Sequence, residues 1–400
     1  MPTPKLRFKE FDGKWDLKSL GDCFSLFSGY AFPSSASVDN GIRWLKIADV
    51  GIQEMTPNNL SFLPNDFKVQ FPQFIVSKND YVIALTRPIL NKKLKIAKVG
   101  EFYDGALLNQ RVAKIVSENN NLDFIYSLLQ KSKTVEELEN SIAGTDPPNL
   151  SLNEVKGIVL GIPKVEEQTK IASFLSNVDE KISQLTQKHE LLSQYKQGMM
   201  QKLFSQQIRF KADDGSEFGE WEEISANELF ENYSNKDHDG TLTILAATQD
   251  KGIVPRDEID IDIKSSDASV LSYKIIEKGS FVISLRSFQG GIEYSNYYGI
   301  CSPAYTILRS LRPIASEFYK NYLKTNDFIQ RLSATVVGIR DGKQISYQAF
   351  STLNIDYPSV EEQTKIANFL SAIDQKIEVV AQQIEQAKQW KKGLLQQMFV

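Results

Sequence analysis

Two groups of polar loop residues are the side chains in this sequence best suited to binding chemistry. Arg and Lys neutralise phosphate groups, and Arg, Asn and Gln form paired hydrogen bonds with the edges of bases. The groups are Arg87, Asn91, Lys92, Lys93, Asn109, Gln110 and Arg111, and Arg286, Ser287, Gln289, Arg340, Lys343 and Gln344. Each residue taken singly also fits a solvated surface position. Their clustering at corresponding places in two halves of the chain favours contacts with nucleic acid.

Side chains for catalysis or metal binding are scarce. Of the two histidines, His189 falls on an apolar helical stripe and His238 in a polar loop. No zinc-ligand spacing, Walker loop or GxSxG motif is present. The acidic residues within 258–262 alternate with Ile, which favours a strand with one solvated face over a metal site. We therefore expect no catalytic residue, no metal and no cofactor.

A segment that occurs twice organises the chain. Residues 163–204 and 358–399 align without a gap at an offset of 195 residues and share the run VEEQTKIA. In both copies a Pro and two Glu mark a helix start, where negative charge complements the helix dipole. Apolar residues then recur at alternating intervals of four and three, the spacing of a coiled coil. The predicted seam comprises Ile171, Leu175, Val178, Ile182, Leu185 and Leu192, and Ile366, Leu370, Ile373, Ile377, Val380 and Ile384.

The two predicted helices can pair with each other within one chain, or each can pair with a second copy of the protein. A weak seam position in one copy corresponds to an apolar one in the other, as at His189 and Ile384. Lys196 and Lys391 interrupt both stripes at the same point. The periodicity alone leaves both arrangements open.

The sequence outside these helices consists of two halves built on one plan. An Arg-Phe pair followed by a Trp opens each half, with Trp15 in the first and Trp221 in the second. Runs of β-branched and aromatic residues predict strands. In the first half we predict strands at 44–47, 81–85, 96–99, 111–115 and 158–162, and helices at 122–130 and 135–142. The second half has a matching pair of predicted helices at 318–324 and 327–333.

The composition is that of a protein with folded cores. Hydrophobic residues make up 42% of the chain, the mean hydropathy is -0.29, and no apolar run is long enough to span a bilayer. Cys23 and Cys301 form no disulfide framework and the first residues lack a signal-peptide core, so we expect a cytoplasmic protein. The net charge of -4 argues against a uniformly basic DNA-binding domain. Residues 87–100 nevertheless carry basic side chains and no acidic one.

The order of variable half, EEQTKIA helix, variable half and EEQTKIA helix resembles the specificity (S) subunit of Type I restriction-modification systems. The resemblance covers essentially the whole chain. It implies an α+β fold, with two mixed α/β target recognition domains separated by two long antiparallel coiled-coil helices in a pseudo-twofold internal repeat. The expected boundaries are 1–162 for target recognition domain 1, 163–205 for conserved helix 1, 206–357 for target recognition domain 2 and 358–400 for conserved helix 2.

The same resemblance implies a non-catalytic subunit that recognises a bipartite, asymmetric target in double-stranded DNA. Two methyltransferase (M) subunits and restriction (R) subunits would be its partners. The assembled complex would carry out adenine methylation or ATP-dependent cleavage. A helix of about 40 residues, at ~1.5 Å per residue, can bridge the ~34–36 Å between neighbouring major-groove sites on one face of DNA.

Two short motifs resemble those of adenine methyltransferases. Residues 27–31 are similar to FxGxG and residues 146–149 to (N/D)PP(Y/F), in the same order. Ala31 replaces the second Gly, and Asn149 replaces the aromatic ring that stacks on a flipped base. At the repeat offset, residues 146–149 correspond to Asp-Gly-Lys-Gln at 341–344, a change that a catalytic motif would not tolerate. We expect no intrinsic methyltransferase activity.

Two other functions are compatible with the sequence. A coiled-coil scaffold whose two domains bind proteins would lack the steep salt dependence that phosphate contacts give to DNA binding. A free-standing adenine methyltransferase would bind S-adenosylmethionine without partners.

Overall fold

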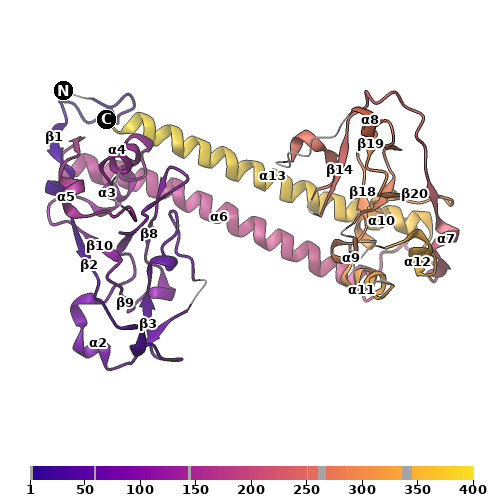
Figure 1. The fold of residues 1–400 in the computed structure, drawn as a ribbon, viewed down its shortest axis with the longest axis horizontal. Coiled ribbons are helices and arrows are strands. Elements are labelled where there is room, and N and C mark those ends of the chain that lie inside the picture. Colours follow the sequence, from indigo (N-terminus) through magenta and orange to yellow (C-terminus); the bar gives the residue numbers. More distant parts are fainter. Residues whose placement is uncertain are drawn as a thin grey trace. The chain divides into compact units, whose positions relative to one another are not determined.

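The computed structural model describes residues 3–57, 60–142, 146–249, 251–259, 267–285, 287–335 and 345–400. The chain forms two compact units, unit 1 (Met1–Thr186 with Gln382–Val400) and unit 2 (Gln187–Ala381). Figure 1 shows a β-rich domain in each unit, with the long helices α6 (Val165–Phe204) and α13 (Val360–Met398) in magenta and yellow. Each unit therefore contains the first part of one long helix and the last part of the other.

The core of unit 1 contains a four-stranded antiparallel sheet. Its strands, in spatial order, are β2 (Ser25–Ser28), β10 (Val112–Val116), β5 (Tyr81–Ala84) and β8 (Ile96–Lys98). Successive residues of a strand face opposite sides of the sheet. Ile83 and Ala113 accordingly pack into the largest core of the unit, whereas Val82 and Val112 pack into a second cluster on the opposite face. Apolar side chains thus cover both faces of this sheet.

Shorter elements surround this sheet. β1 (Asp16–Ser19) pairs with β11 (Val159–Ile162), β3 (Ile42–Leu45) lies between β4 (Phe62–Leu63) and β9 (Leu107–Leu108), and β6 (Ile89–Leu90) pairs with β7 (Lys93–Leu94). The helices are α1 (Leu20–Cys23), α2 (Phe67–Gln70), α3 (Leu122–Leu128), α4 (Ser132–Ile142) and α5 (Leu152–Lys156), with 3-10 turns at Ser34–Ala36, Ile47–Asp49, Pro72–Phe74 and Glu101–Tyr103. All the strands and helices predicted for this half are confirmed, with ends within three residues of those predicted.

Unit 2 repeats the plan. Its four-stranded sheet has the order β13 (Phe230–Tyr233), β20 (Thr306–Ser310), β17 (Phe281–Ile283) and β18 (Glu293–Tyr294), and β12 (Glu222–Ser225) pairs with β21 (Asn354–Tyr357). Two further antiparallel pairs are β14 (Leu245–Thr248) with β15 (Gly252–Pro255), and β16 (Lys274–Ile276) with β19 (Gly299–Cys301). The helices are α7 (Ala226–Leu229), α8 (Asp267–Val270), α9 (Ser287–Gly290), α10 (Ser316–Tyr322), α11 (Asn326–Ala334) and α12 (Tyr347–Ser351).

The structure describes only part of one predicted element of unit 2. We expected a strand at 258–262; Glu258 instead ends a 3-10 turn that begins at Arg256, Ile259 has extended backbone, and residues 260–262 lie outside the described residues. The turn follows Pro255, whose fixed φ of -51° suits a change of direction at the end of β15. The predicted helical pair is present as α10 and α11.

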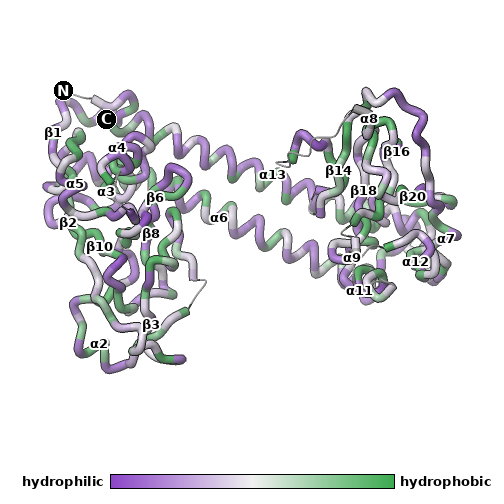
Figure 2. Tube along the Cα trace, in the orientation of Figure 1, coloured by the Kyte–Doolittle hydropathy of each residue, from purple (hydrophilic) through white to green (hydrophobic). Residues whose placement is uncertain are grey.

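The long helices are antiparallel. In unit 1, Ile171 near the start of α6 shares a core with Met398 at the end of α13. In unit 2, Ile366 near the start of α13 shares a core with Leu203 near the end of α6. Figure 2 shows hydrophobic residues at intervals along both helices, with hydrophilic residues between them. Of the predicted seam residues, Ile182, Leu192 and Ile377 are half-buried and the others are buried.

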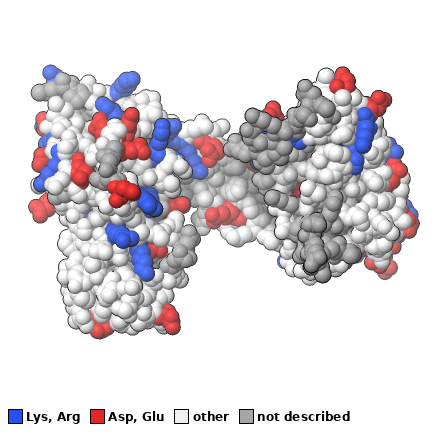
Figure 3. Space-filling view, viewed as in Figure 1, with Lys and Arg blue, Asp and Glu red and all other residues white. Residues whose placement is uncertain are grey.

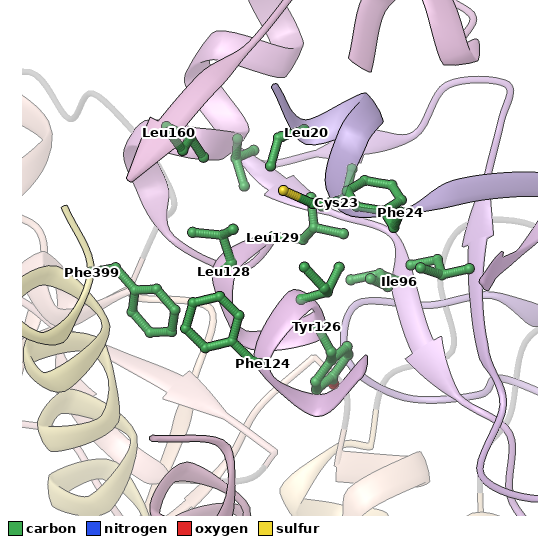
Figure 4. Close-up of a cluster of buried hydrophobic side chains, with 14 of the residues drawn as sticks. Leu20, Cys23, Phe24, Ile96, Phe124, Tyr126, Leu128, Leu129, Leu160 and Phe399 are labelled. Atoms are coloured by element: carbon green, nitrogen blue, oxygen red, sulfur yellow. The ribbon is translucent and has the colours of Figure 1, made fainter. Parts of the chain in front are cut away.

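The core of unit 1 joins segments far apart in the sequence. Figure 4 shows Phe124 of α3 against Phe399, which follows α13, with the ring centroids 5.2 Å apart. The Leu6 backbone N–H donates to the Gln397 carbonyl oxygen at 2.9 Å, so the first and last described segments lie side by side. Among the described residues, no helix combines the length and the apolar character needed to cross a membrane.

Candidate nucleic-acid interface

A buried carboxylate at the start of each long helix explains the repeated Arg-Phe and Trp motif. Glu167 is 3% exposed. The Arg7 guanidinium donates through Nε and Nη2 to its two carboxylate oxygens, both at 2.7 Å, and the Trp15 indole N–H donates to Oε1 at 3.2 Å. Such a bidentate pair fixes orientation as well as distance. The chain entering unit 1 is therefore fixed to the first turn of α6.

Unit 2 contains the same arrangement. Glu362 is 1% exposed and accepts from Arg209 Nε at 3.0 Å and from Nη2 at 2.7 Å. The Trp221 indole N–H donates to Glu362 at 2.9 Å. The three residue types recur together because burying the carboxylate requires a cation and a donor for its oxygens.

The glutamine that follows each glutamate connects the long helix to a second segment of the domain. Asn121 immediately precedes α3, and its backbone N–H donates to Gln168 Oε1 at 2.9 Å. Gln168 Nε2 donates to the Pro163 carbonyl oxygen at 2.9 Å. In unit 2, Gln363 Oε1 accepts from the Ala315 backbone N–H, which precedes α10, at 2.9 Å. Both glutamines are buried. The duplicated helix start is thus a joint that fixes each domain to its helix.

The seven candidate residues of unit 1 lie at one end of its central sheet. The antiparallel register aligns Ser28 with Ala113, Val112 with Ala84, and Ile83 with Ile96. The end of β2, the start of β10, the end of β5 and the start of β8 therefore meet at the same end of the sheet. The candidate residues belong to the two loops at this end, residues 85–95 and 109–111.

Backbone hydrogen bonds tie these loops together. The Leu85 N–H donates to the Arg111 carbonyl at 2.9 Å, and the Gln110 N–H donates to the Tyr30 carbonyl at 3.0 Å. Asn109 is half-buried, and its side-chain oxygen accepts from the Arg111 N–H at 3.0 Å. The other six candidates are exposed: Arg87, Asn91, Lys92, Lys93, Gln110 and Arg111. No described carboxylate forms an ion pair with any of the four cations in this set.

The loop 85–95 contains a hairpin with an unusual turn. Leu90 pairs with Lys93, leaving Asn91 and Lys92 as a two-residue connection. Their φ angles are 51° and 57°, the signs required by a type I′ turn. Asn suits the first position, whereas the second is normally Gly. A non-glycine residue in this left-handed region carries a conformational cost of about 1–2 kcal/mol.

The described candidates of unit 2 lie at the equivalent end of its sheet. Ile283 of β17 pairs with Thr306 of β20, so the β17–β18 loop at 284–292 leaves the sheet at this end. Gln289 is exposed there. Four predicted contact residues lie outside the described residues: Arg286, Arg340, Lys343 and Gln344.

Ser287 requires a correction. It is 1% exposed, and its hydroxyl oxygen accepts a hydrogen bond from the Ser284 backbone N–H at 2.9 Å. Its side chain therefore holds the loop from within, and we no longer expect it to contact a ligand. Gly291, which flanks this segment, has a φ of 79°, and a Cβ there would lie 2.3 Å from the Leu323 carbonyl oxygen. Close packing against the Leu323 backbone therefore explains why position 291 is glycine.

The two methyltransferase-like motifs also have structural explanations. A Cβ at Gly29 would lie 2.1 Å from the Leu108 carbonyl oxygen, so the close approach of these two backbone segments requires glycine at position 29. Asn149 accepts from the Thr86 hydroxyl at 2.7 Å, and the Pro148 carbonyl accepts from the Arg87 N–H at 2.8 Å. Both motifs shape the same end of the sheet.

The described side chains give little support for a catalytic histidine or a metal site. The His238 ring nitrogens lie 3.0 Å from the Tyr273 carbonyl oxygen and from the Gly240 N–H, so this ring stabilises a loop. Within the described ranges, no cluster of three or more His, Cys, Asp or Glu could hold a metal ion. On the face of unit 1 in Figure 3, basic and acidic side chains are interspersed. The sheet end is therefore identified by its residue types and geometry, not by a uniformly charged face.

Comparison with known proteins identifies the family. The model of the Type I restriction modification DNA specificity domain matches residues 12–194 and 219–389, most of the chain in two copies. The chain belongs to this specificity-domain family. The two matched regions each include one β-rich domain and much of the long helix that follows it.

Relatives in the specificity-domain family support this membership. The chain is 30% identical over 209 residues to the Type I restriction enzyme MjaVIII specificity subunit of Methanocaldococcus jannaschii, covering 52% of this chain and 49% of that protein. It is 28% identical over 166 residues to the EcoAI specificity subunit of Escherichia coli, covering 41% of this chain and 28% of that protein. The chain thus matches about half, or less, of the length of these relatives.

A solved structure has the same fold. The crystal structure of a Type-I restriction-modification system S subunit from M. genitalium matches with a TM-score of 0.60 at 16% identity, covering 100% of this chain and 99% of that one. The predicted fold class is confirmed: two mixed α/β domains, two long antiparallel helices and a pseudo-twofold repeat.

The Arg–Glu–Trp joint of this specificity-domain chain was not predicted from its sequence. The motif residues Arg7 and Trp15 and the first-turn Glu167 were each noted separately, but not as one cluster. Their joint recurrence in both halves was the available signal. An Arg and a Glu that are duplicated together, with one at a helix start, indicate an ion pair that both halves share.

Proposed function

We propose that this chain is a non-catalytic specificity subunit that recognises a bipartite, asymmetric target in double-stranded DNA. One half-site would be bound by the sheet end of unit 1 and the other by the sheet end of unit 2. The observation that carries this proposal is the gathering of exposed Arg, Lys, Asn and Gln side chains in the two loops at the end of the unit 1 sheet.

The joints of the two units are alike, whereas their loops at the sheet ends differ, and this difference supports two different half-sites. The Arg–Glu–Trp cluster and the buried glutamine are the same in both units. The loops at the two sheet ends differ in length and sequence, with a basic hairpin in one and the short helix α9 in the other. A repeated framework that presents different loops can bind two unrelated sequences.

The proposed partners are two methyltransferase subunits and restriction subunits. In the assembled complex they would supply adenine methylation and ATP-dependent cleavage at sites chosen by this chain. The repeated helices offer the same surface twice, which suits two copies of one partner. The complex would act in the cytoplasm, where its DNA substrate lies.

The first test is a map of adenine methylation in host DNA with and without the gene for this chain. The expected result is loss of methylation at one split, asymmetric motif when the gene is deleted. An unchanged map in cells that express the chain and its partner subunits would contradict the proposal.

Binding measurements separate the proposal from the two alternatives. DNA binding by the complex should weaken steeply with salt, because phosphate contacts release counterions. A protein-binding scaffold would show no such DNA binding. A free-standing methyltransferase would bind S-adenosylmethionine as the isolated chain, which the proposed subunit should not.

A further inference from the structure

Half of the non-glycine residues with positive φ in the described parts of the chain lie in one loop. They are Arg87 (47°), Asn91 (51°) and Lys92 (57°), and the others are Gln53, Asn79 and Gln206. Residues held in this region despite their side chains concentrate at functional sites, where the side chain is needed. The loop 85–95 is therefore a candidate for a ligand contact.

Folding does not account for the side chain at Lys92. The second position of a type I′ turn favours Gly, and Lys has a Cβ that opposes the left-handed conformation. Lys92 is exposed, and its ammonium group makes no hydrogen bond or ion pair with any described residue. A glycine would form the same turn more easily.

Arg87 is disfavoured on two grounds. It has a φ of 47°, and it precedes Pro88, whose ring normally forces the previous residue into an extended conformation. The Arg87 backbone N–H is used, because it donates to the Pro148 carbonyl at 2.8 Å. Its guanidinium is exposed and, like the Lys92 ammonium, has no partner among the described residues. The backbone contact would survive replacement by glycine, so folding does not account for the charged side chain at this position.

Two further lysines of this basic segment differ from these residues. Lys98 lies 3.3 Å from the Asp123 carboxylate. Lys95 is half-buried, and burial lowers the pKa of its ammonium group. Only the residues at the exposed end of the loop, Arg87, Lys92 and the neighbouring Lys93, present unpaired charge to a ligand among the described residues of this segment.

Resting on the proposed function, we propose that Arg87 and Lys92 form a phosphate clamp that binds the DNA backbone beside the half-site of unit 1. Lys acts as a point charge toward phosphate and Arg as a two-pronged donor. Lys92 lies in the exposed turn of the hairpin, and Arg87 lies just before its first strand, so both charges can reach phosphates of a bound duplex. The adjacent, exposed Gln110 and Arg111 are left to contact base edges. Phosphate contacts set the position of the protein, and base contacts give the sequence preference.

The test uses glycine substitutions, which remove the side chain and relieve the backbone. Arg87→Gly and Lys92→Gly are compared with wild type in the complex with methyltransferase subunits. Matched controls are Asn79→Gly and Gln206→Gly, which replace exposed positive-φ residues outside the loop. Thermal stability is measured first, and DNA affinity is then measured over a range of salt concentrations, with the mapped target and with a scrambled duplex.

We expect both loop variants to be at least as thermally stable as wild type. Their affinity should fall severalfold, by the same factor for target and scrambled DNA. The slope of log affinity against log salt should decrease by about 0.9 for each lost phosphate contact. Lys92→Arg should retain affinity and slope. Both controls should keep the wild-type DNA affinity.

Two outcomes would overturn the clamp. Loop variants with wild-type affinity and salt slope would show that neither side chain binds phosphate. Loop variants that lose stability along with affinity, while the controls do not, would assign these residues to folding. Failure of the proposed function is distinguishable, because the wild-type complex itself would then show no preference for the mapped target.

Discussion

The Lys391 ammonium lies 2.6 Å from the Asp179 carboxylate, and the Lys196 ammonium lies 2.7 Å from Asp374. Each pair joins α13 to α6, and the two pairs are related by the repeat offset of 195 residues. Each lysine that interrupts an apolar stripe therefore forms an ion pair with an aspartate of the other helix. Paired charges within an apolar seam favour one alignment of two helices over others.

Removing Asp179 should destabilise the chain more than removing Asp374. Lys391 is 6% exposed and also donates to Gln130 at 2.9 Å, so Asp179→Ala leaves a buried charge with weaker partners. We expect a loss of about 1.5–3 kcal/mol. The Lys196 side chain is 21% exposed, so water can replace its aspartate. Asp374→Ala should cost at most about 1 kcal/mol. Denaturant midpoints measure both changes, and equal losses would contradict the difference in burial.

The carboxylate at the start of α6 should be essential for stability. Glu167→Ala leaves the Arg7 guanidinium without its bidentate partner at a site where the Glu167 side chain is 4% exposed. A loss of about 3–5 kcal/mol is typical of breaking such a pair. Glu166 is the matched control, because it is adjacent and exposed. Glu166→Ala should change stability by less than about 0.5 kcal/mol. Comparable losses for the two variants would disprove the role of the cluster.

Gln110 and Gln289 should affect different half-sites. Both are exposed amides at the equivalent ends of the two sheets. A bidentate contact to a base contributes about 1–3 kcal/mol of discrimination. We therefore expect Gln110→Ala to relax sequence preference in one half of the mapped motif and Gln289→Ala in the other. Methylation maps of cells carrying each variant measure this. Relaxation of the same half by both variants would rule out the assignment of one half-site to each unit.

Asp356 should make stability depend on pH. Burial raises the pKa of Asp356 above its usual value of 3.8, although the Tyr322 hydroxyl donates to it at 3.2 Å. The folded state holds this proton to higher pH than the unfolded state does, so the contribution of Asp356 to stability falls as pH rises from 3.8 through the raised pKa. Asp356→Asn should therefore gain stability relative to wild type across that range. Thermal denaturation at a series of pH values tests this, and a constant difference between the two proteins would refute it.

The long helices and their apolar stripes were predictable because a heptad repeat is a local pattern. Ile171, Leu175 and their equivalents Ile366 and Leu370 are all nearly fully buried. Strands rich in β-branched residues, such as β5 and β10, were also predictable, whereas short strands without such a run, such as β1 (DLKS), were not. The gathering of Arg87 and Arg111 at one sheet end was anticipated only as a cluster in sequence, because the register that brings the loops together is not local.

Other features had no usable signal in the sequence. The turn at Asn91 and Lys92 lacks the glycine that usually marks a type I′ hairpin. Ser287 could not be distinguished from a surface serine, because a small hydroxyl residue satisfies either environment. The Asp179 partner of Lys391 lies far along the chain, so only the fold reveals the pair.

The hydrogen bond that Gln168 accepts from a backbone N–H has an evolutionary consequence. Its donor is the main chain of Asn121, and the donor to Gln363 is the main chain of Ala315. Every amino acid except proline carries that donor. These two bonds therefore do not depend on the side chain at the donor position, although Gln168 also donates to the Asn120 side chain at 2.8 Å. Position 121 or 315 can therefore change to any residue except proline and still donate to the glutamine, without a compensating substitution in the long helix.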